Sequence, residues 1–139
     1  MDTVMMSTRW LLIALHAVIG VAAIGAGQAF VRDPSGEALG MTTDWLERSP
    51  FPDFRIPGLF LAVVVGGSNL LSALALWRRH PLAPLASLGT GLLLVAWVAI
   101  QTAMIGFRHW SQGLWWAISL LVTALATRHW RATRGPRGG

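Results

Sequence analysis

His16 is the only ionisable side chain deep within a long apolar run of this chain. It lies about 9 Å beyond Trp10 along a helix, and Asn69 lies about as deep when counted inward from Trp77. We therefore predict that His16 and Asn69 meet in a polar cluster. Neighbouring hydroxyl groups could join this cluster: Ser72, Thr90, Ser119 and Thr123.

This cluster has two interpretations. An ionisable group inside a membrane is a functional hypothesis by default, so His16 and Asn69 could form a ligand or proton site. Alternatively, a neutral histidine bonds a facing side chain and fixes the register of the helices. The second interpretation is favoured, because the apolar runs contain no carboxylate that could act as a proton partner.

A second polar group lies toward the opposite ends of the apolar runs. It contains Gln28, Gln101 and Thr102, with Arg55, Arg108 and His109 beyond them. Arginine binds anionic head groups well, so a quinone or lipid pocket is one hypothesis for this group. Snorkelling of long side chains to the membrane surface is the simpler interpretation.

Other chemistry finds little support in the sequence. The acidic residues of the segment 31–57 lack the spacing of metal ligands, so we expect no metal site. Haem held by two histidines needs both at a compatible depth, and only His16 is deep, so we expect no cofactor. The chain shows no nucleophile–base pair and no phosphate-binding loop, which disfavours an enzyme.

The elements that position these residues are long and apolar. The chain has 139 residues and no cysteine, and its charged fraction is 12%, about half that of a soluble domain. Four runs contain no formally charged residue: 10–30, 58–77, 85–106 and 110–127. About 20 apolar residues cross a bilayer as a helix, and lipid excludes structures with unsatisfied backbone groups. We therefore predict an all-α polytopic membrane protein, a four-transmembrane-helix bundle within residues 1–130.

Two stripes of small residues indicate how the first two helices pack. Gly20, Ala23 and Gly27 continue the face of His16. The second run carries a matching stripe: Ala62, Gly66, Asn69 and Ala73. Small residues allow the backbones of two membrane helices to approach closely, so we expect these stripes to face each other.

The arginine distribution predicts the orientation. Seven arginines flank the N-terminal run, the 78–84 loop and the C-terminal tail, and four lie on the opposite side. The positive-inside rule then places both termini in the cytoplasm, as expected for an inner-membrane protein. The absence of lysine and tyrosine, with a single asparagine, suggests a GC-rich bacterial genome. A cleaved signal peptide is the alternative for the first run, although that run is longer than a usual signal-peptide core.

The segment 31–57 is predicted to form a compact outer cap. Asp33-Pro34-Ser35-Gly36 is a strong turn signal. Thr43 or Asp44 could cap a short interfacial helix over about 44–49, which would lay Trp45 and Leu46 on the bilayer surface. At the other end of the chain, residues 131–139 are predicted to form a disordered basic cytoplasmic tail.

The cap motifs carry a resemblance. Residues 33–36 and the run Ser49-Pro50-Phe51-x-Asp53-Phe54-x-Ile56-Pro57-Gly58 resemble a pattern of small bacterial four-helix membrane proteins, similar in architecture to the DoxX-like group. Ile100-Gln101 through Ile105-Gly106-Phe107, with Gln112, extends the similarity. The resemblance implies architecture and membrane location only, and no catalytic residue carries over.

Two functional hypotheses follow. The first is a non-catalytic subunit or interaction protein, with membrane lipids and either a second copy or another membrane protein as partners. The second is binding or transport of a small lipophilic molecule, quinone-like or lipid-like, within the bundle. The basic pI reflects the positive-inside pattern, so we expect no nucleic-acid partner.

Overall fold

The computed structural model describes residues 3–134, which form helices joined by short connections and contain no strand. The elements in chain order are α1 (Thr3–Arg32), η1 (Glu37–Leu39), η2 (Thr43–Leu46), α2 (Arg55–Phe60), η3 (Leu61–Gly66), α3 (Gly67–Trp77), α4 (Ala83–Ile105) and α5 (Trp110–Thr133). Three of these elements, α2, η3 and α3, follow one another without a break and form a single rod. Within this rod, η3 is a π-helical segment. The all-helical prediction is confirmed.

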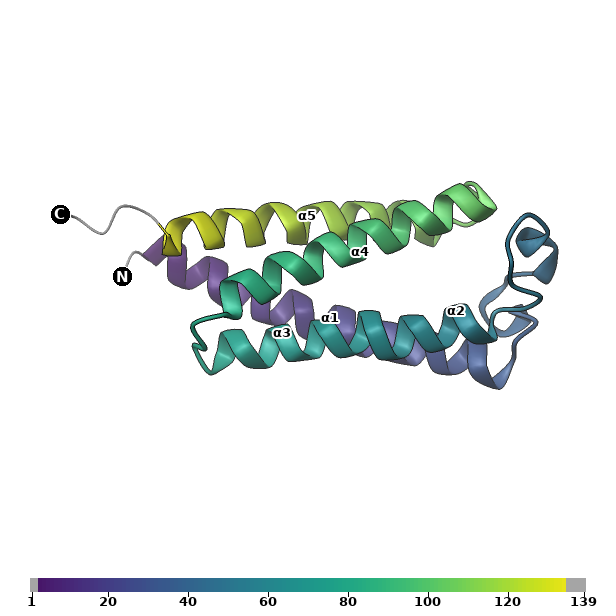
Figure 1. Cartoon of the computed structure of the whole chain (residues 1–139), viewed down its shortest axis with the longest axis horizontal. Helices are drawn as coiled ribbons and strands as arrows, with labels where there is room; N and C mark the ends of the chain where they lie inside the picture. The colour runs from purple at the N-terminus through teal and green to yellow at the C-terminus, as the bar shows by residue number, and fades with distance from the viewer. Residues whose placement is uncertain (1–2, 135–139) are drawn as a thin grey trace.

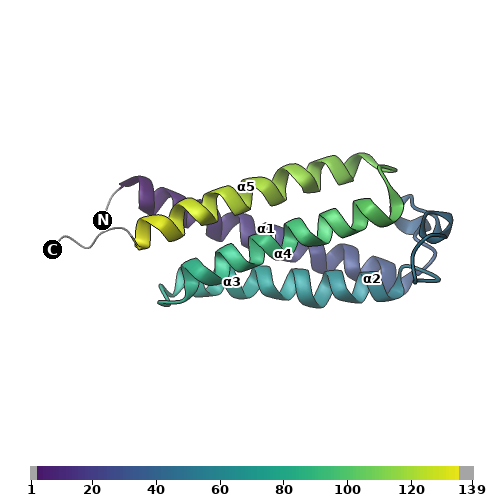
Figure 2. The same ribbon diagram turned by 45° about the horizontal axis from the view of Figure 1, so that its top comes forward.

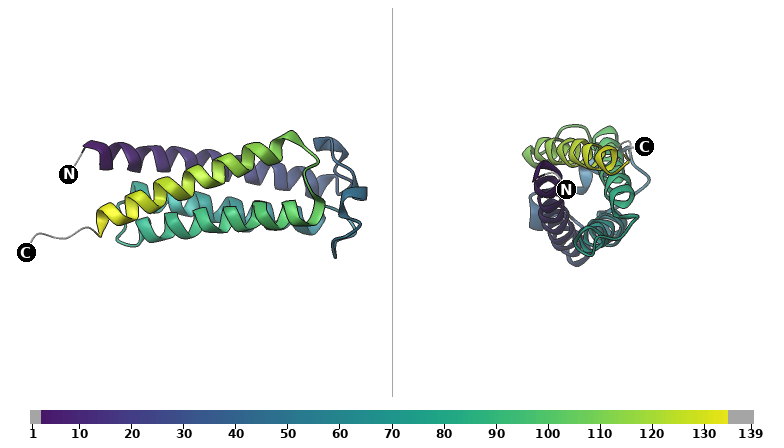
Figure 3. Two further views of the ribbon diagram at one scale, coloured as in Figure 1. Left: turned by 90° about the horizontal axis from the view of Figure 1, so that it is seen from above. Right: turned by 90° about the vertical axis from the view of Figure 1, so that its left-hand side faces the viewer.

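The rods run up and down in a four-membered bundle (Figure 1, Figure 2). Helix α1 packs on the α2–α3 rod, α3 packs on α4, α4 packs on α5, and α5 packs back on α1. The end-on view in Figure 3 shows the four rods around a common centre. We name the two ends of the bundle by what they carry. The terminal end carries residues 3–9, the 78–82 turn and residues 128–134, and the cap end carries residues 33–54 and 106–109.

Three helices are long and apolar enough to cross a membrane: Thr3–Arg32, Arg55–Trp77 and Ala83–Ile105. Their outward faces carry apolar side chains, and Val18, Val21 and Leu71 are each about two-thirds exposed. A soluble bundle would cover such faces with charge, whereas lipid solvates them. The chain is therefore a membrane protein with at least these three candidate spans. Helix α5 is comparable in length but less apolar.

Close backbone contact joins α1 to the α2–α3 rod, as the small-residue stripes predicted. A Cβ atom added at Gly27 would lie 2.5 Å from the carbonyl oxygen of Gly58 and 2.6 Å from the Cβ of Ala62. Farther along, a Cβ at Gly20 would lie 3.1 Å from the Gly66 carbonyl oxygen. Only glycine permits this separation, so the sequence of the stripe sets the distance between the two rods.

The cap differs in part from its prediction. The predicted 44–49 helix is the shorter 3₁₀ turn η2, and the residue that caps it is Thr42, whose hydroxyl accepts from Asp44 N. Leu46 is not on the bilayer surface but buried in a small core: Phe30, Leu46, Phe54 and Ile105. Pro50 and Pro52 lie too close behind η2 for an α-helix to extend, and inward burial of Leu46 removes more apolar area from water than surface contact would.

The helix ends also extend beyond the predicted runs. Helix α1 begins seven residues before residue 10, and the second rod begins at Arg55 instead of residue 58. Helix α5 continues to Thr133, so residues 131–133 are helical and not part of a disordered tail. The remaining tail residues 135–139 lie outside the described residues. A run without charged residues predicts the part of a helix that lies in the hydrocarbon. The helix itself continues as far as its backbone hydrogen bonds do, so it can be longer than the run.

Candidate functional site

The predicted polar cluster lies at the centre of the bundle and joins three helices. The His16 side chain of α1 is fully buried, and its Nδ1 lies 2.8 Å from Oδ1 of Asn69 on α3. Its Nε2 lies 2.7 Å from the hydroxyl oxygen of Ser87 on α4. One imidazole ring therefore bonds across the bundle to two other helices.

The amide of Asn69 fixes which nitrogen of His16 carries a proton. Asn69 Nδ2 donates to the Val65 carbonyl at 2.8 Å, so the amide oxygen is the atom that faces the ring. An amide oxygen only accepts, and Nδ1 of His16 must donate to it. In a neutral ring Nε2 then accepts from the Ser87 hydroxyl. Every polar atom of this group has a partner, which favours a structural cross-link over a ligand site.

Of the hydroxyl groups that the sequence suggested, two form a separate pair. Ser72 and Thr90 lie 2.8 Å apart, oxygen to oxygen, and join α3 to α4. Ser119 and Thr123 instead donate to carbonyl oxygens of their own helix and do not reach His16. Ser87, the missed partner, was detectable: Ser87, Gly91, Leu94 and Val98 repeat at helical spacing, and all are buried.

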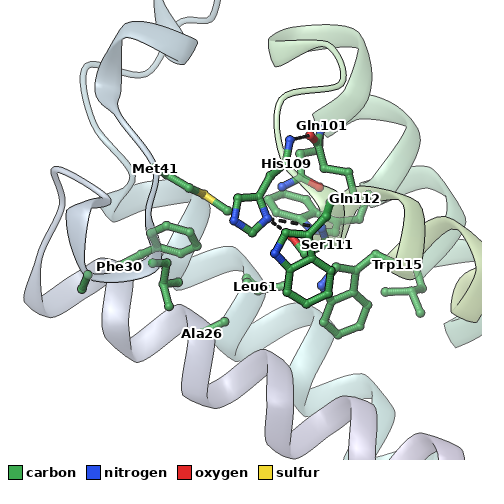
Figure 4. Close-up of a pocket in the computed structure, with 14 residues that line it drawn as sticks. Ala26, Phe30, Met41, Leu61, Gln101, His109, Ser111, Gln112 and Trp115 are labelled. Carbon is green, nitrogen blue, oxygen red and sulfur yellow. Dashed lines mark hydrogen bonds between the residues drawn. The ribbon is translucent and has the colours of Figure 1, made fainter.

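A cavity of about 490 Å³ lies at the cap end, between the rods and beneath the cap (Figure 4). Its wall is mainly apolar and aromatic: Ala26, Phe30, Leu39, Met41, Leu61, Leu94, Trp97, Trp110 and Trp115. Polar atoms come from four side chains, Gln101, His109, Ser111 and Gln112. All four rods and the cap contribute to this cavity, whereas His16 and Asn69 are not among its lining residues.

Two of its polar side chains also build the turn between α4 and α5. Gln112 is buried, and its Oε1 accepts from the backbone N–H groups of Arg108 and His109 at 2.7 and 2.8 Å. Its Nε2 donates to the Gly106 carbonyl at 2.7 Å. His109 caps α5, because its Nδ1 accepts from the backbone N–H of Ser111. The cavity wall is thus held by bonds within the turn.

Only Gln101 and His109 of the second predicted polar group line this cavity. Gln28 and Arg55 are exposed and do not line the cavity. Arg108 donates from Nε to the Ile105 carbonyl at 3.0 Å, and Thr102 accepts from the indole N–H of Trp116. Sequence spacing placed these residues near one end of the bundle but could not tell which ones turn inward.

The π-helical segment η3 contributes directly to the cavity, since its first residue, Leu61, is part of the wall. A π-helical turn inserts an extra residue into a helix and is often found next to functional sites. Phe60, which precedes it, stacks on Trp97 with ring centroids 5.0 Å apart. The irregular segment therefore begins next to a stacked pair of which one ring, Trp97, lines the cavity.

Asp33 organises the start of the cap beside this cavity. Its Oδ1 accepts from the Ser35 hydroxyl at 2.5 Å, and its Oδ2 accepts from the backbone N–H of Ala38 at 3.0 Å. The bond from the Ser35 hydroxyl, followed by that from Ala38 N, lowers the pKa of the Asp33 carboxyl below its usual value. The cap is therefore held by an ionised side chain at neutral pH.

Comparisons with known proteins give no match to a protein-family model, to a curated protein or to a solved structure. The resemblance to the DoxX-like group stays a prediction.

Proposed function

We propose that this protein binds a small lipophilic molecule in the cap-end cavity. The observation that carries the proposal is the cavity itself, about 490 Å³ in volume and lined by apolar and aromatic side chains with a few polar groups. Ligand pockets typically hold about 300–1,000 Å³ and have this mixture of surfaces. Of the two hypotheses from the sequence, the cavity favours ligand binding over a purely structural subunit.

The polar groups suggest the class of ligand. Nδ1 of His109 accepts from Ser111, so a neutral ring carries its proton on Nε2 and can donate to a carbonyl oxygen. Gln101 can donate and accept at the same cavity. The indole rings of Trp97 and Trp115 offer flat surfaces for stacking. A ring with carbonyl oxygens and an apolar tail, as in a quinone, fits this combination.

The proposal includes a topology of four crossings with both termini in the cytoplasm of a bacterial cell. Helix α5 has 24 residues, about 36 Å of length, and packs along α4 and against α1. Its low apolarity comes partly from tryptophans, which membranes accept near their surfaces. The excess of arginine at the terminal end supports its cytoplasmic placement.

Quenching of tryptophan fluorescence tests ligand binding, because three tryptophans line the cavity. The probe is decylbenzoquinone, added to the purified protein in detergent. We expect saturable quenching in the wild type and at least about tenfold weaker binding in Ala26→Phe, which fills the cavity. Ala22→Phe is the matched control, since Ala22 lies one turn earlier on α1 and is exposed.

Equal quenching of both variants would show that the quinone only partitions into the detergent around the protein, and the proposal would be wrong. Co-purification of one fixed membrane partner, together with unsaturable quenching, would instead support the subunit hypothesis.

A further inference from the structure

A second cavity, of about 500 Å³, opens at the terminal end and has a different chemical character. Basic side chains dominate its polar lining: Arg9, Arg79, His80, His129 and Arg134. They come from α1, from the turn after α3 and from α5, so three separate parts of the chain bring positive charge to one place. Trp130 lies in the same wall.

Arg9 forms the deepest charge of this cavity. It is only 8% exposed, and two of its three guanidinium nitrogens donate to the end of α3: Nε to the Leu76 carbonyl at 2.9 Å and Nη2 to the Trp77 carbonyl at 3.1 Å. The third nitrogen, Nη1, is buried and has no hydrogen-bond partner among residues 3–134. A buried guanidinium with a missing partner is costly unless an anion compensates it.

His129 repeats this pattern on α5. Its side chain is 4% exposed, and its Nδ1 is buried without a hydrogen-bond partner in the described part of the chain. These two atoms are the only buried side-chain nitrogens or oxygens left unsatisfied within residues 3–134, and both belong to side chains of one cavity. Buried polar atoms are normally satisfied, so such a pair points to a missing partner.

Arg79 at the mouth of the cavity stands in an unfavourable backbone conformation. Its φ is +54°, and within residues 3–134 it is the only residue other than glycine with a positive φ. The helix ends here with the N–H of His80 bonded to the Ala75 carbonyl, a pattern whose left-handed position is usually glycine. Glycine would form this turn at lower conformational cost, so the backbone conformation does not explain why residue 79 is an arginine.

No acidic side chain balances this charge within the described residues. Every aspartate and glutamate of residues 3–134 lies between 33 and 53, in the cap at the opposite end of the bundle. Trp10, Trp77 and Trp130 mark the membrane boundary at the terminal end, the level at which lipid phosphates lie. An anion from the surroundings is therefore the natural partner of these cations.

We propose that the terminal-end cavity is a binding site for a phosphate group, supplied by a lipid head group or by free phosphate. Arg9 and His129 provide the buried wall, and the exposed arginines 79 and 134 close over the phosphate from the rim. Arginine suits this role because its planar donors match two phosphate oxygens at once. The site lies at the opposite end from the cap-end cavity and does not depend on the function proposed for that cavity.

The test compares two double variants of equal charge in the purified full chain. Arg79→Gly with Arg134→Gln removes both rim arginines, and the glycine also relieves the left-handed backbone. Arg78→Gln with Arg131→Gln is the matched control, because both arginines are exposed at the same end but do not line the cavity. Circular dichroism and gel filtration establish that each variant is folded.

Binding is measured by isothermal titration calorimetry with three probes: dihexanoyl phosphatidic acid, inorganic phosphate and dihexanoylglycerol. We expect the phosphatidic acid to bind the wild type and the control alike, and the rim variant at least about tenfold more weakly, because charge-assisted bonds are lost. Comparable binding of inorganic phosphate would identify a free anion as the ligand, and binding of the phosphatidic acid alone would identify a lipid.

Three results would overturn the proposal. Equal weakening of the rim variant and the control would reduce the site to a diffuse basic surface. Binding of dihexanoylglycerol as strong as that of phosphatidic acid would show that acyl chains, not phosphate, are recognised. Absence of binding to the folded wild type by both phosphate-bearing probes would remove the site altogether.

Discussion

At the scale of single residues, the bonds of His16 determine which helices meet at the centre of the bundle. The ring reaches Asn69 on α3 and Ser87 on α4, and α4 lies diagonally across from α1. In an apolar interior such bonds cannot be replaced by water. They therefore select one rotation and one depth for each of three helices.

A double-mutant cycle tests the bond between His16 and Asn69. His16→Leu and Asn69→Leu should each lower the free energy of unfolding in detergent, by about 1–3 kcal/mol, because a buried partner is left unsatisfied. The double variant should lose less than the sum, since the two side chains share one bond.

Ser119→Ala serves as the control for this cycle, because that hydroxyl bonds within its own helix. Its effect should add to that of His16→Leu. Additive losses for His16→Leu and Asn69→Leu as well would show that the pair contributes no coupling.

Asp33 makes the stability of the cap depend on pH. Because the folded pKa lies below the unfolded one, the carboxylate stabilises the fold above the unfolded value of about 3.9, and this contribution is lost as pH falls through the folded pKa. The thermal stability advantage of the wild type over Asp33→Asn should therefore shrink between neutral pH and about pH 3.

Ser35→Ala provides the comparison for this measurement, since it removes the strongest cause of the lowered pKa. In the Ser35→Ala background, the thermal stability advantage of Asp33 over the Asp33→Asn substitution should be smaller at neutral pH. It should also disappear at a higher pH than in the wild type. An advantage that stays constant with pH would contradict the role given to the carboxylate.

The sequence was informative at this scale where depth along a helix decides a contact. His16 and Asn69 were paired because both lie at similar distances from boundary tryptophans, and the structure places them 2.8 Å apart. It was less informative about Ser119 and Thr123, which lie in the same half of the bundle. Hydroxyl groups can bond to the preceding turn of their own helix, and depth alone does not exclude that choice.

At the scale of elements, the glycines of α1 determine how closely two rods approach. Gly27→Ala should destabilise the protein by about 1–3 kcal/mol, because its new methyl group meets the backbone of Gly58, which cannot rotate away. The measurement is thermal unfolding in detergent, followed by the loss of helical circular dichroism.

Gly25→Ala is the matched control on the same helix. No atom lies within 4 Å of a Cβ added there, so the gain in helix propensity should leave stability unchanged or raised by up to about 1 kcal/mol. A similar loss in both variants would mean that glycine flexibility, and not close packing, explains the stripe.

The Gln112 side chain stabilises the turn at the start of α5. Gln112→Ala removes three hydrogen bonds to the 106–109 turn and should cost about 2–3 kcal/mol, with faster hydrogen exchange in that turn. Gln112→Glu keeps the acceptor oxygen and should lose less. Unchanged exchange in Gln112→Ala would contradict the importance of this cap.

The number of rods and their main contacts could be predicted because lipid imposes a length and small residues mark close approach. The π-helical segment could not, since its sequence, Leu61–Gly66, has the same apolar character as an ordinary helix. Neither could the inward burial of Leu46, because the cap is compact only once Phe30, Phe54 and Ile105 are assembled from three parts of the chain.

At the scale of the whole molecule, the two ends of the bundle differ in chemistry. The cap end holds an aromatic cavity beneath all the acidic residues of the described chain, and the terminal end holds a cavity lined by arginine and histidine. The His16 cluster separates them with a packed, fully bonded layer. The sequence predicted polar residues at both ends. It could not predict the two cavities, because each cavity is lined by side chains from several helices.

In the proposed topology the chain crosses the membrane four times and the terminal end faces the cytoplasm. The most direct measurement exploits the absence of cysteine from the sequence. Single cysteines at four exposed positions, Arg48→Cys, Pro81→Cys, Phe107→Cys and Ala132→Cys, are labelled in intact cells with a membrane-impermeant maleimide.

We expect labelling at 48 and 107 in intact cells, and at 81 and 132 only after the membrane is permeabilised. The pair that brackets α5 is decisive, because α5 is the least apolar rod. Labelling of 107 and 132 from the same side would show that α5 does not cross, and labelling of 81 and 132 from outside would show that the proposed orientation is reversed.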